Sequence, residues 1–338
     1  MNNIIYKVLA IVICSVAFVN FSWAQELYPT QPQQEKDCEV EEFTALSVGD
    51  NFQVTLREGA CAVNLTADEA LLPYILVSVR DSVLCIEYDE KSVPRDVKKV
   101  YRGKNAPVPV LSVSVSSPFL NSITAMDNAV ISGSGSGSST VFSDDLEMNL
   151  SEKATLKDLK LDTDRAILRM DKHSVADITL KSESQMEVSL KGNSQLKLQY
   201  KSRNLLLHQE GNSTAILDGE SSTATFAVSG FAKNRCTDKG NVLVLEAGGS
   251  ADISLAGEIG DLTLTCERNA KVDALEMKTG RVKATLNGWT SASVNAQEFL
   301  SVHMTGGSTL SFAGVPAIQV DKIMKSSLIH IEENEQEK

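Results

Sequence analysis

The sequence predicts an all-β fold: a right-handed parallel β-helix, closed at its N-terminal end by a β-sheet cap. Three observations support this prediction. Small polar corners recur along most of the chain, apolar and polar residues alternate on both sides of each corner, and aromatic residues make up only 5% of the sequence. A tube built of short strands accepts small and medium aliphatic side chains in its interior, which explains the scarcity of aromatic residues.

The corners form an internal repeat. The tripeptide Gly-Asn-Ser occurs at Gly192 and again at Gly211, and related corners continue in both directions. The first gap is longer than the others, and the later corners recur with a nearly constant period of roughly 19 residues, which indicates a solenoid. The eleven corners are Asp127-Asn-Ala, Glu152-Lys-Ala, Lys172-His-Ser, Gly192-Asn-Ser, Gly211-Asn-Ser, Gly230-Phe-Ala, Gly248-Gly-Ser, Arg268-Asn-Ala, Gly288-Trp-Thr, Gly306-Gly-Ser and Met324-Lys-Ser.

The alternation around each corner predicts half-buried strands. Leu196 and Leu198 follow one corner, and Met186, Val188 and Leu190 precede it, each separated by one residue. When such strands stack about 4.8 Å apart in successive coils, every coil must bend sharply at the same place. Glycine and asparagine tolerate the positive φ that a sharp bend requires. A β-sandwich would instead show turns at intervals of about half this period, without the longer repeat.

Residues 1–24 have the pattern of a secretory signal peptide. Lys7 precedes an apolar run, and the segment ends in Ser22-Trp23-Ala24 before Gln25. The run is too short for a membrane span, and no later stretch is longer, so no transmembrane segment is expected. Cys14 lies inside the run, which does not match a lipid-anchor site. We therefore expect an exported chain that starts near Gln25 and lies in the periplasm, at the cell surface or outside the cell.

Charge argues against nucleic acid or an anionic membrane as the main partner. The chain has 32 Lys and Arg against 44 Asp and Glu, and removal of Lys7 leaves a formal charge of −13. One basic cluster is interpreted as a solvated loop. It consists of Lys91, Arg95, Lys98, Lys99, Arg102 and Lys104.

Five cysteines remain after export: Cys38, Cys61, Cys85, Cys236 and Cys266. Their number is odd and no pair has CxxC spacing, so neither a zinc site nor a dense disulfide framework is indicated. One bridge among the first three is compatible with an oxidising compartment. Buried, reduced thiols are the default interpretation, and the pairing stays open.

The chain divides into five predicted segments: the signal peptide at 1–24, a linker at 25–42, cap strands and a second linker at 43–118, the repeated coils of the β-helix at 119–331, and a charged tail at 332–338. Within the cap we expect two alternating strands, a short segment around Asp68 to Leu72, and two further strands that meet at Asp81-Ser82. A cap is needed because an open strand edge invites aggregation.

At this point the chain resembles the secreted bacterial proteins known as putative autotransporter adhesins with a head GIN domain. The resemblance rests on Phe43, Leu46, Val48, Phe52, Val54, Leu56 and Gly59, on Leu84 and Ile86, and on "VLSVSVSSPFLNSITAMDNAVISGSG" at 110–135. It covers roughly 40–330. It implies a β-helix, export to the periplasm or cell surface, and an adhesive or binding role, with no catalytic residues. "MDNAVI" replaces a stretch that is often glycine-rich in the family.

Trp289 is the one candidate ligand-binding residue. It occupies a corner where other coils have a small residue, and an exposed indole is a common platform for sugar rings or a partner's surface. The alternative is that the ring packs under a loop. The sequence indicates no catalytic, cofactor-binding or metal-binding residue, and no cofactor.

Three other patterns are weighed and set aside. His173, His208, His303 and His330 lie in different coils, although His173 and His208 could approach each other on one face. "GSGSGSS" at 133–139 lacks the lysine of a phosphate-binding loop and leads into a strand. The carboxylates of Asp144 and Asp145, Asp162 and Asp164, and Asp171 and Asp177 could line one face at the spacing of a glycosidase pair, but they lack a flanking cluster of basic and aromatic residues.

Three functions remain in competition. The sequence favours a non-enzymatic, adhesin-like module that recognises a polysaccharide or a protein on a cell surface. A self-associating structural protein of the envelope comes second, because the acidic C-terminus opposes end-to-end stacking. A polysaccharide-cleaving enzyme comes third. The ligand, the binding face and the oligomeric state are not determined by the sequence.

Overall fold

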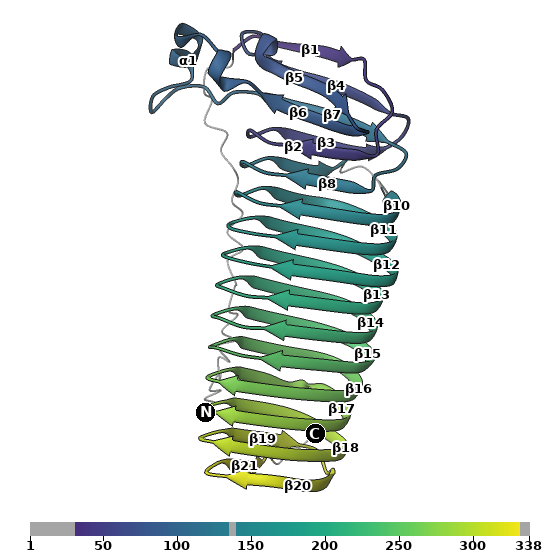
Figure 1. The fold of residues 1–338 in the computed structure, drawn as a ribbon, viewed down its shortest axis with the longest axis vertical. Coiled ribbons are helices and arrows are strands. Elements are labelled where there is room, and N and C mark those ends of the chain that lie inside the picture. Colours follow the sequence, from purple (N-terminus) through teal and green to yellow (C-terminus); the bar gives the residue numbers. More distant parts are fainter. Residues whose placement is uncertain (1–30, 135–139, 332–338) are drawn as a thin grey trace, which may run out of the picture.

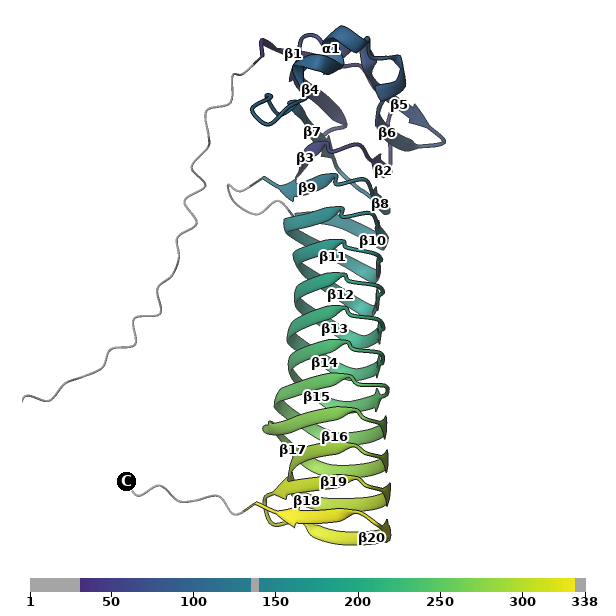
Figure 2. The same ribbon diagram turned by 90° about the vertical axis from the view of Figure 1, so that its left-hand side faces the viewer.

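The computed structural model describes residues 31–134 and 140–331. These residues form a long tube of stacked strands with a wider head at the N-terminal end (Figures 1 and 2). Strands from successive coils pair in parallel and in register, and Leu196 lies directly opposite Ala215 in the ladder. The predicted parallel β-helix is therefore confirmed.

Each full coil consists of one long strand that crosses one face of the tube, bends in its middle and returns along the other face (Figure 2). A tight corner then leads into the next strand. The strands of the tube are β8 (Ser122–Ala125), β9 (Val130–Gly133), β10 (Thr140–Leu150), β11 (Thr155–Met170), β12 (Val175–Leu190), β13 (Gln195–Gln209), β14 (Thr214–Val228), β15 (Lys233–Ala247), β16 (Asp252–Arg268), β17 (Lys271–Gly288), β18 (Ser291–Gly306), β19 (Thr309–Ala313), β20 (Ala317–Met324) and β21 (Ser327–His330).

The tight corners need both a left-handed backbone and empty space. Gly192 has φ +66° and Gly211 has φ +78°. A Cβ added to Gly211 would lie 2.8 Å from the carbonyl oxygen of Gly192 in the coil before it. Two corners fall one residue later than the sequence pattern placed them, because the residues with positive φ are Gly249 and Lys325.

The second, wider bend uses buried hydroxyl groups. Ser182 Oγ lies 2.9 Å from the carbonyl oxygen of Asp164 and 2.7 Å from that of Gln185. Thr163 Oγ1 lies 2.9 Å from the carbonyl oxygens of Asp144 and Arg165. Each hydroxyl can donate to one of these carbonyls, which the bend takes out of the regular ladder. The hydroxyls therefore replace backbone hydrogen bonds at this bend.

The core runs the length of the tube as stacked rings of aliphatic side chains. On the face that precedes the corners, Leu207, Phe226, Leu245 and Leu264 are fully buried and follow one another from coil to coil. Burying one such side chain contributes roughly 1.5–3 kcal/mol. Stability is therefore spread along the tube rather than concentrated in one place.

The head does not stack in chain order. β2 (Ala45–Val48) and β3 (Gln53–Glu58) form a rung of their own that pairs in parallel with β8 and β9 on one side and with β6 and β7 on the other. The segment predicted as cap therefore also contains a coil. The other head elements are β1 (Gln33–Cys38), β4 (Ala62–Asp68), η1 (Leu72–Tyr74), β5 (Ile75–Arg80), β6 (Val83–Tyr88), η2 (Glu90–Ser92), α1 (Arg95–Val100) and β7 (Leu111–Ser117).

Two features of the head refine the predicted segments. The hairpin of β5 and β6 turns at Asp81 and Ser82, as expected, with positive φ at both residues. β1 lies inside the segment predicted as a linker, 25–42, and pairs antiparallel with β4. Its sequence, QQEKDC, has no apolar alternation, so it gave no strand signal. The predicted signal peptide and charged tail lie outside the described residues.

A buried aspartate holds the long loop of the head in place. Asp68 Oδ2 accepts a hydrogen bond from the Tyr101 hydroxyl at 2.9 Å and another from the Val110 amide at 3.3 Å. The phenol is partly withdrawn from water and bonded to the carboxylate, which raises the pKa of Tyr101 well above its usual range. The loop that carries α1 is therefore fixed to the sheet at two points.

Candidate functional site

The tips of the tight corners form a line along the tube, which we call the corner ridge. The tip residues from Asn193 to Gly307 are tied to the coil before them by a backbone hydrogen bond, for example from the Asn212 amide to the Gly192 carbonyl at 2.8 Å. Consecutive tips are about 4.8 Å apart, the spacing of stacked strands. The corner ridge consists of His173, Asn193, Asn212, Phe231, Ser250, Asn269, Trp289 and Gly307.

Trp289 projects from the ridge and does not pack under a loop. Its side chain is 79% exposed, and its amide donates to the Arg268 carbonyl at 2.7 Å. The indole lies against the backbone of Gly307 in the next coil, where an added Cβ would be only 2.5 Å from Cε3. Gly307 therefore leaves room for the ring to rest on the ridge.

Phe231 is a second exposed aromatic residue on the same ridge. It is 68% exposed, and its amide donates to the Gly211 carbonyl at 2.8 Å. Three coils separate Phe231 from Trp289, so their positions are about 14 Å apart along the tube. Gly230-Phe-Ala was predicted as a corner, but Phe231 was not predicted as a site residue. The signal was available, because Phe231 and Trp289 occupy the same position of the repeat.

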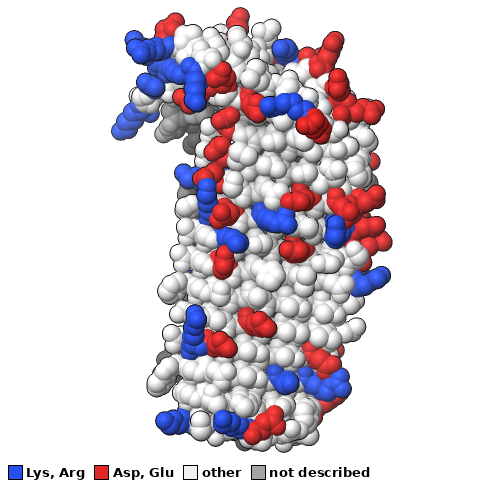
Figure 3. All heavy atoms as spheres, in the orientation of Figure 1, with Lys and Arg blue, Asp and Glu red and all other residues white. Residues whose placement is uncertain are grey.

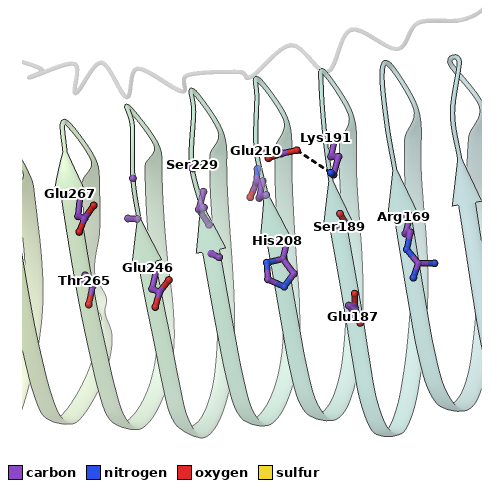
Figure 4. Close-up of a pocket in the computed structure, with 15 residues that line it drawn as sticks. Arg169, Glu187, Ser189, Lys191, His208, Glu210, Ser229, Glu246, Thr265 and Glu267 are labelled. Atoms are coloured by element: carbon purple, nitrogen blue, oxygen red, sulfur yellow. Dashed lines mark ion pairs between the residues drawn. The ribbon is translucent and has the colours of Figure 1, made fainter.

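A shallow groove runs beside the ridge on the face that precedes the corners, and encloses about 660 Å³ (Figure 4). Its floor is low where Ala227, Ser229 and Gly248 occupy outward positions. Larger side chains, including His208 and Glu246, stand on the neighbouring coils (Figure 4). The groove is thus produced by small residues in consecutive coils, a pattern that alternation alone does not reveal.

The groove is acidic. Four carboxylates line it, from Glu187, Glu210, Glu246 and Glu267. Glu210 forms an ion pair with Lys191 at 3.3 Å, drawn as a dashed line in Figure 4. The other lining cation, Arg169, pairs with Glu147 at 2.5 Å. Within the described residues, Glu187, Glu246 and Glu267 have no salt-bridge partner, so their oxygens are available as hydrogen-bond acceptors.

The four histidines do not form a site. His173 and His208 lie two coils apart, one at a ridge tip and the other on the preceding face. His173 Nε2 is 3.2 Å from Nδ2 of the Asn193 side chain. The His330 ring stacks on Phe312 with ring centroids 4.8 Å apart. Within residues 31–134 and 140–331, no group of three His, Cys, Asp or Glu side chains is placed to hold a metal ion.

Three of the aspartates considered as candidates for a glycosidase pair form ion pairs with cations of a neighbouring coil. Asp145 bonds to Arg165 at 2.8 Å, Asp162 to Lys181 at 3.1 Å, and Asp177 to Lys197 at 3.0 Å. All three pairs are solvent-exposed and bridge neighbouring coils, so each adds at most about 1 kcal/mol. The glycine-rich stretch at 135–139 lies outside the described residues.

The five cysteines are free. Cys236 and Cys266 are buried in the tube, and burial raises the pKa of the Cys266 thiol to about 12. Both thiols therefore stay protonated and act as small apolar core residues, as the default interpretation predicted, whereas Cys38, Cys61 and Cys85 are only partly buried.

A buried polar group lies inside the tube at the wide bend of β15. Asp238 is fully buried and its Oδ2 accepts a hydrogen bond from the Ser221 hydroxyl at 2.8 Å. Burial raises the pKa of Asp238, while hydrogen bonds from Ser221 and Tyr200 act in the opposite direction. The group is sealed from solvent, so it belongs to the structure of the tube and not to a surface site.

None of the helices in the described part of the chain has the length and apolar character needed to cross a membrane. Together, the groove and the ridge offer exposed aromatic faces and hydrogen-bond acceptors on a rigid support. Such a surface can bind an extended ligand along the tube.

The chain is similar to a protein family and to several solved structures. No curated protein matches the sequence. A crystal structure of a putative adhesin from Bacteroides fragilis aligns over 90% of this chain and 99% of its own, with 15% identity and a TM-score of 0.28. A putative adhesin from Parabacteroides merdae aligns over 89% and 96%, with 15% identity and a TM-score of 0.33. A putative lipid binding protein from Parabacteroides distasonis aligns over 89% and 97%, with 14% identity and a TM-score of 0.31.

A family model covers most of the chain, in two matches over residues 42–238 and 236–316. Its description is "Putative auto-transporter adhesin, head GIN domain", which is the family that the sequence resembles. The chain therefore belongs to this family of putative auto-transporter adhesins with a head GIN domain.

Proposed function

We propose that the protein is an exported, non-enzymatic, adhesin-like module that binds an extended polysaccharide of a cell surface along the corner ridge and the adjoining groove. One observation carries the proposal: Phe231 and Trp289, both largely exposed, stand on the same ridge three coils apart, and Ser229, two residues before Phe231, lines the groove. Large apolar side chains exposed at matching positions of a repeat are typical of a binding surface.

The coil spacing supports a sugar polymer as the ligand. Tips recur about every 4.8 Å, close to the length of one hexose unit in an extended chain. Aromatic faces stack on the apolar faces of sugar rings, and the short polar side chains between them, Ser250 and Asn269, can bond to hydroxyl groups. A ligand that runs along the tube would thus meet an aromatic ring at both ends of this stretch.

The negative charge of the groove favours a neutral polysaccharide over an anionic one. Glu187, Glu246 and Glu267 can accept hydrogen bonds from sugar hydroxyls, whereas they repel uronic acids and sulfated sugars. We therefore expect a neutral polysaccharide. A protein that offers a basic segment is the competing ligand, and it would depend on these carboxylates more than on the two aromatic rings.

Affinity electrophoresis and calorimetry with neutral and anionic polysaccharides test the proposal on the mature chain. Phe231→Ala and Trp289→Ala should each weaken binding of a neutral polysaccharide at least tenfold, because each removes a stacking face worth about 1.5 kcal/mol. Ile216→Ala is the matched control, since it removes an exposed apolar side chain from the opposite face of the tube. Unchanged binding in both aromatic variants, or new reducing ends in the polysaccharide, would contradict the proposal.

Self-association of the tube is the second candidate function, and exposed apolar side chains on the last coil support it. β20 leaves Ile318, Val320 and Ile323 exposed at the end of the tube. Against it, the pairing of β20 with β18 is irregular at Asp321, next to Lys322, and bulges and charges protect strand edges from pairing. Sedimentation velocity over a range of concentrations distinguishes the two, since only self-association gives species that grow with concentration.

A further inference from the structure

A second surface lies on the loop that closes the head, far from the ridge. Six cations, Lys91, Arg95, Lys98, Lys99, Arg102 and Lys104, follow one another closely, and the stretch from 91 to 104 contains a single acidic residue, Asp96. We call these six cations the basic head patch. It forms the concentration of blue at the head in Figure 3, above a tube on which both signs of charge are mixed.

The patch is not neutralised by the protein itself. Among the described residues, none of its six cations takes part in a salt bridge. On the tube, by contrast, eight cations bridge to carboxylates, most of them on a neighbouring coil, for example Lys201 to Glu220 and Arg281 to Asp261. The nearby Asp89 interacts with Lys91 without forming a salt bridge, and its carboxylate accepts a hydrogen bond from the Ser92 hydroxyl at 2.5 Å. The positive charge of the patch is therefore directed to solvent.

The patch is held on an ordered support. Tyr101 and Val110 both bond to the buried Asp68. Val93 is buried, and Val97 packs against the core. The cations of α1 and of the residues after it thus project from a segment that is anchored on both sides, so little conformational entropy is lost when the patch binds a surface.

Apolar side chains are exposed among the cations. Val100, on α1, is 41% exposed, and Val108, in the same loop, is 69% exposed. Cations next to exposed apolar residues are typical of segments that rest in the interface of a lipid bilayer, where the charges meet headgroups and the apolar groups enter the acyl boundary. A soluble anionic polymer would use the cations but gain little from the valines.

The acidic charge of the whole chain does not prevent such contact. At physiological ionic strength, exposed charges more than about 8 Å apart are largely screened. The patch lies on the head, and the tube, on which both signs of charge are mixed, extends away from it (Figures 1 and 3). Both the head and the tube carry a small excess of acidic residues, so the local charge of the patch, and not the net charge of either part, decides what the patch can approach.

From these observations we propose that the basic head patch docks on an anionic lipid bilayer, with Val100 and Val108 entering the headgroup region. The tube then projects from the membrane and carries the corner ridge away from it. This inference is independent of the ligand of the ridge.

Vesicle co-sedimentation tests the docking, with the mature chain and vesicles of phosphatidylglycerol and phosphatidylcholine against vesicles of phosphatidylcholine alone. We expect at least tenfold tighter binding to the anionic vesicles, decreasing with added salt. The triple variant Lys98→Glu, Lys99→Glu, Arg102→Glu should bind roughly 100-fold more weakly. The matched control is Lys233→Glu, Lys271→Glu, Lys283→Glu, which changes the net charge equally on the tube.

The variant Val100→Ser, Val108→Ser separates a bilayer from other polyanions. It should weaken vesicle binding several-fold while leaving the binding of dextran sulfate unchanged, and its small surface changes preserve the fold should the triple variant not. Equal loss in the patch and tube charge variants would overturn the proposal. So would vesicle binding that does not respond to the valine substitutions, or a wild-type chain that does not bind anionic vesicles.

Discussion

Each coil of the tube reverses direction twice, and the two bends are built in different ways. At the tight corner, a residue with positive φ turns the backbone, usually a glycine such as Gly211 or Gly230. At the wide bend, a buried hydroxyl such as that of Ser182 or Thr163 bonds to carbonyl groups that leave the ladder. The first bend depends on backbone conformation, and the second on side-chain hydrogen bonds and space inside the tube.

The difference explains why only one of the bends is visible in the sequence. A requirement for positive φ favours glycine, so glycine recurs at the corners, for example at Gly192, Gly211 and Gly230. A buried serine or threonine looks in the sequence like any polar residue of an alternating strand. The wide bends were therefore not predicted, although one occurs in each full coil.

The largest loss of stability is expected from a substitution that disrupts a wide bend. Gly240 lies next to the bend of β15, and a Cβ at this position would overlap the carbonyl oxygen of Ser221 in the coil before it. Because that oxygen belongs to the backbone, the stack itself must shift. Gly240→Ala should lower the free energy of unfolding by about 3 kcal/mol, measured by urea denaturation followed by circular dichroism.

Lys239→Ala is the control for this prediction, because it changes an exposed residue of the same bend and should cost less than about 0.5 kcal/mol. Equal stability of the two variants would mean that the wide bend adapts to added volume. Space inside the tube would then not be what distinguishes the wide bend from the tight corner.

A smaller effect is expected at the corner, where two adjacent glycines provide an internal comparison. Gly249 has φ +69°, and a Cβ there would lie 2.8 Å from backbone atoms of Gly230. At Gly248, φ is not positive and the nearest atom to an added Cβ is 3.9 Å away. Gly249→Ala should destabilise by about 2 kcal/mol. Gly248→Ala should be neutral or stabilise by about 0.5 kcal/mol, because it restricts the unfolded chain.

Thermal unfolding of the two variants side by side measures this difference. If Gly248→Ala proved to be the more damaging substitution, the corner would lie one residue earlier, where the sequence pattern had placed it.

Much of the fold followed from the sequence, for physical reasons that particular residues illustrate. The period of the corners and the alternation around Leu196 and Leu198 fixed the parallel stacking. The rung of β2 and β3 could not be foreseen, because its strands pair with β8 and β9, which come much later in the chain, and alternation carries no information on partners. β1 lacks alternation altogether.

The candidate site was only partly predictable. Trp289 stood out because a large residue replaced a small one at a known corner, and the same argument would have found Phe231. The groove could not be predicted from single positions of the repeat. Its floor of Ala227, Ser229 and Gly248 has meaning only when the coils are stacked in register, so that small residues become neighbours.

The smallest expected effect concerns the carboxyl group at the wide bend of β15. Burial raises the pKa of Asp238 above its ordinary value of 3.8, so between these two values the folded chain binds a proton that the unfolded chain has released. Stability therefore falls as the pH rises through this window and levels off above it. Asp238→Asn removes the effect and keeps an oxygen that can accept from Ser221. The variant should match wild type below about pH 4 and exceed it by about 1 kcal/mol at neutral pH.

An exposed carboxylate on the tube provides the comparison of opposite sign. Arg281 lowers the pKa of Asp261, so the contribution of this ion pair is present above the ordinary pKa and is lost as the pH falls. Asp261→Asn should therefore differ from wild type at neutral pH and converge with it in acid. Melting temperatures of the three proteins from acid to neutral pH measure both slopes. Parallel curves for wild type and Asp238→Asn would show that the wide bend tolerates a buried charge without cost. The hydrogen bonds from Ser221 and Tyr200 would then compensate for the loss of water.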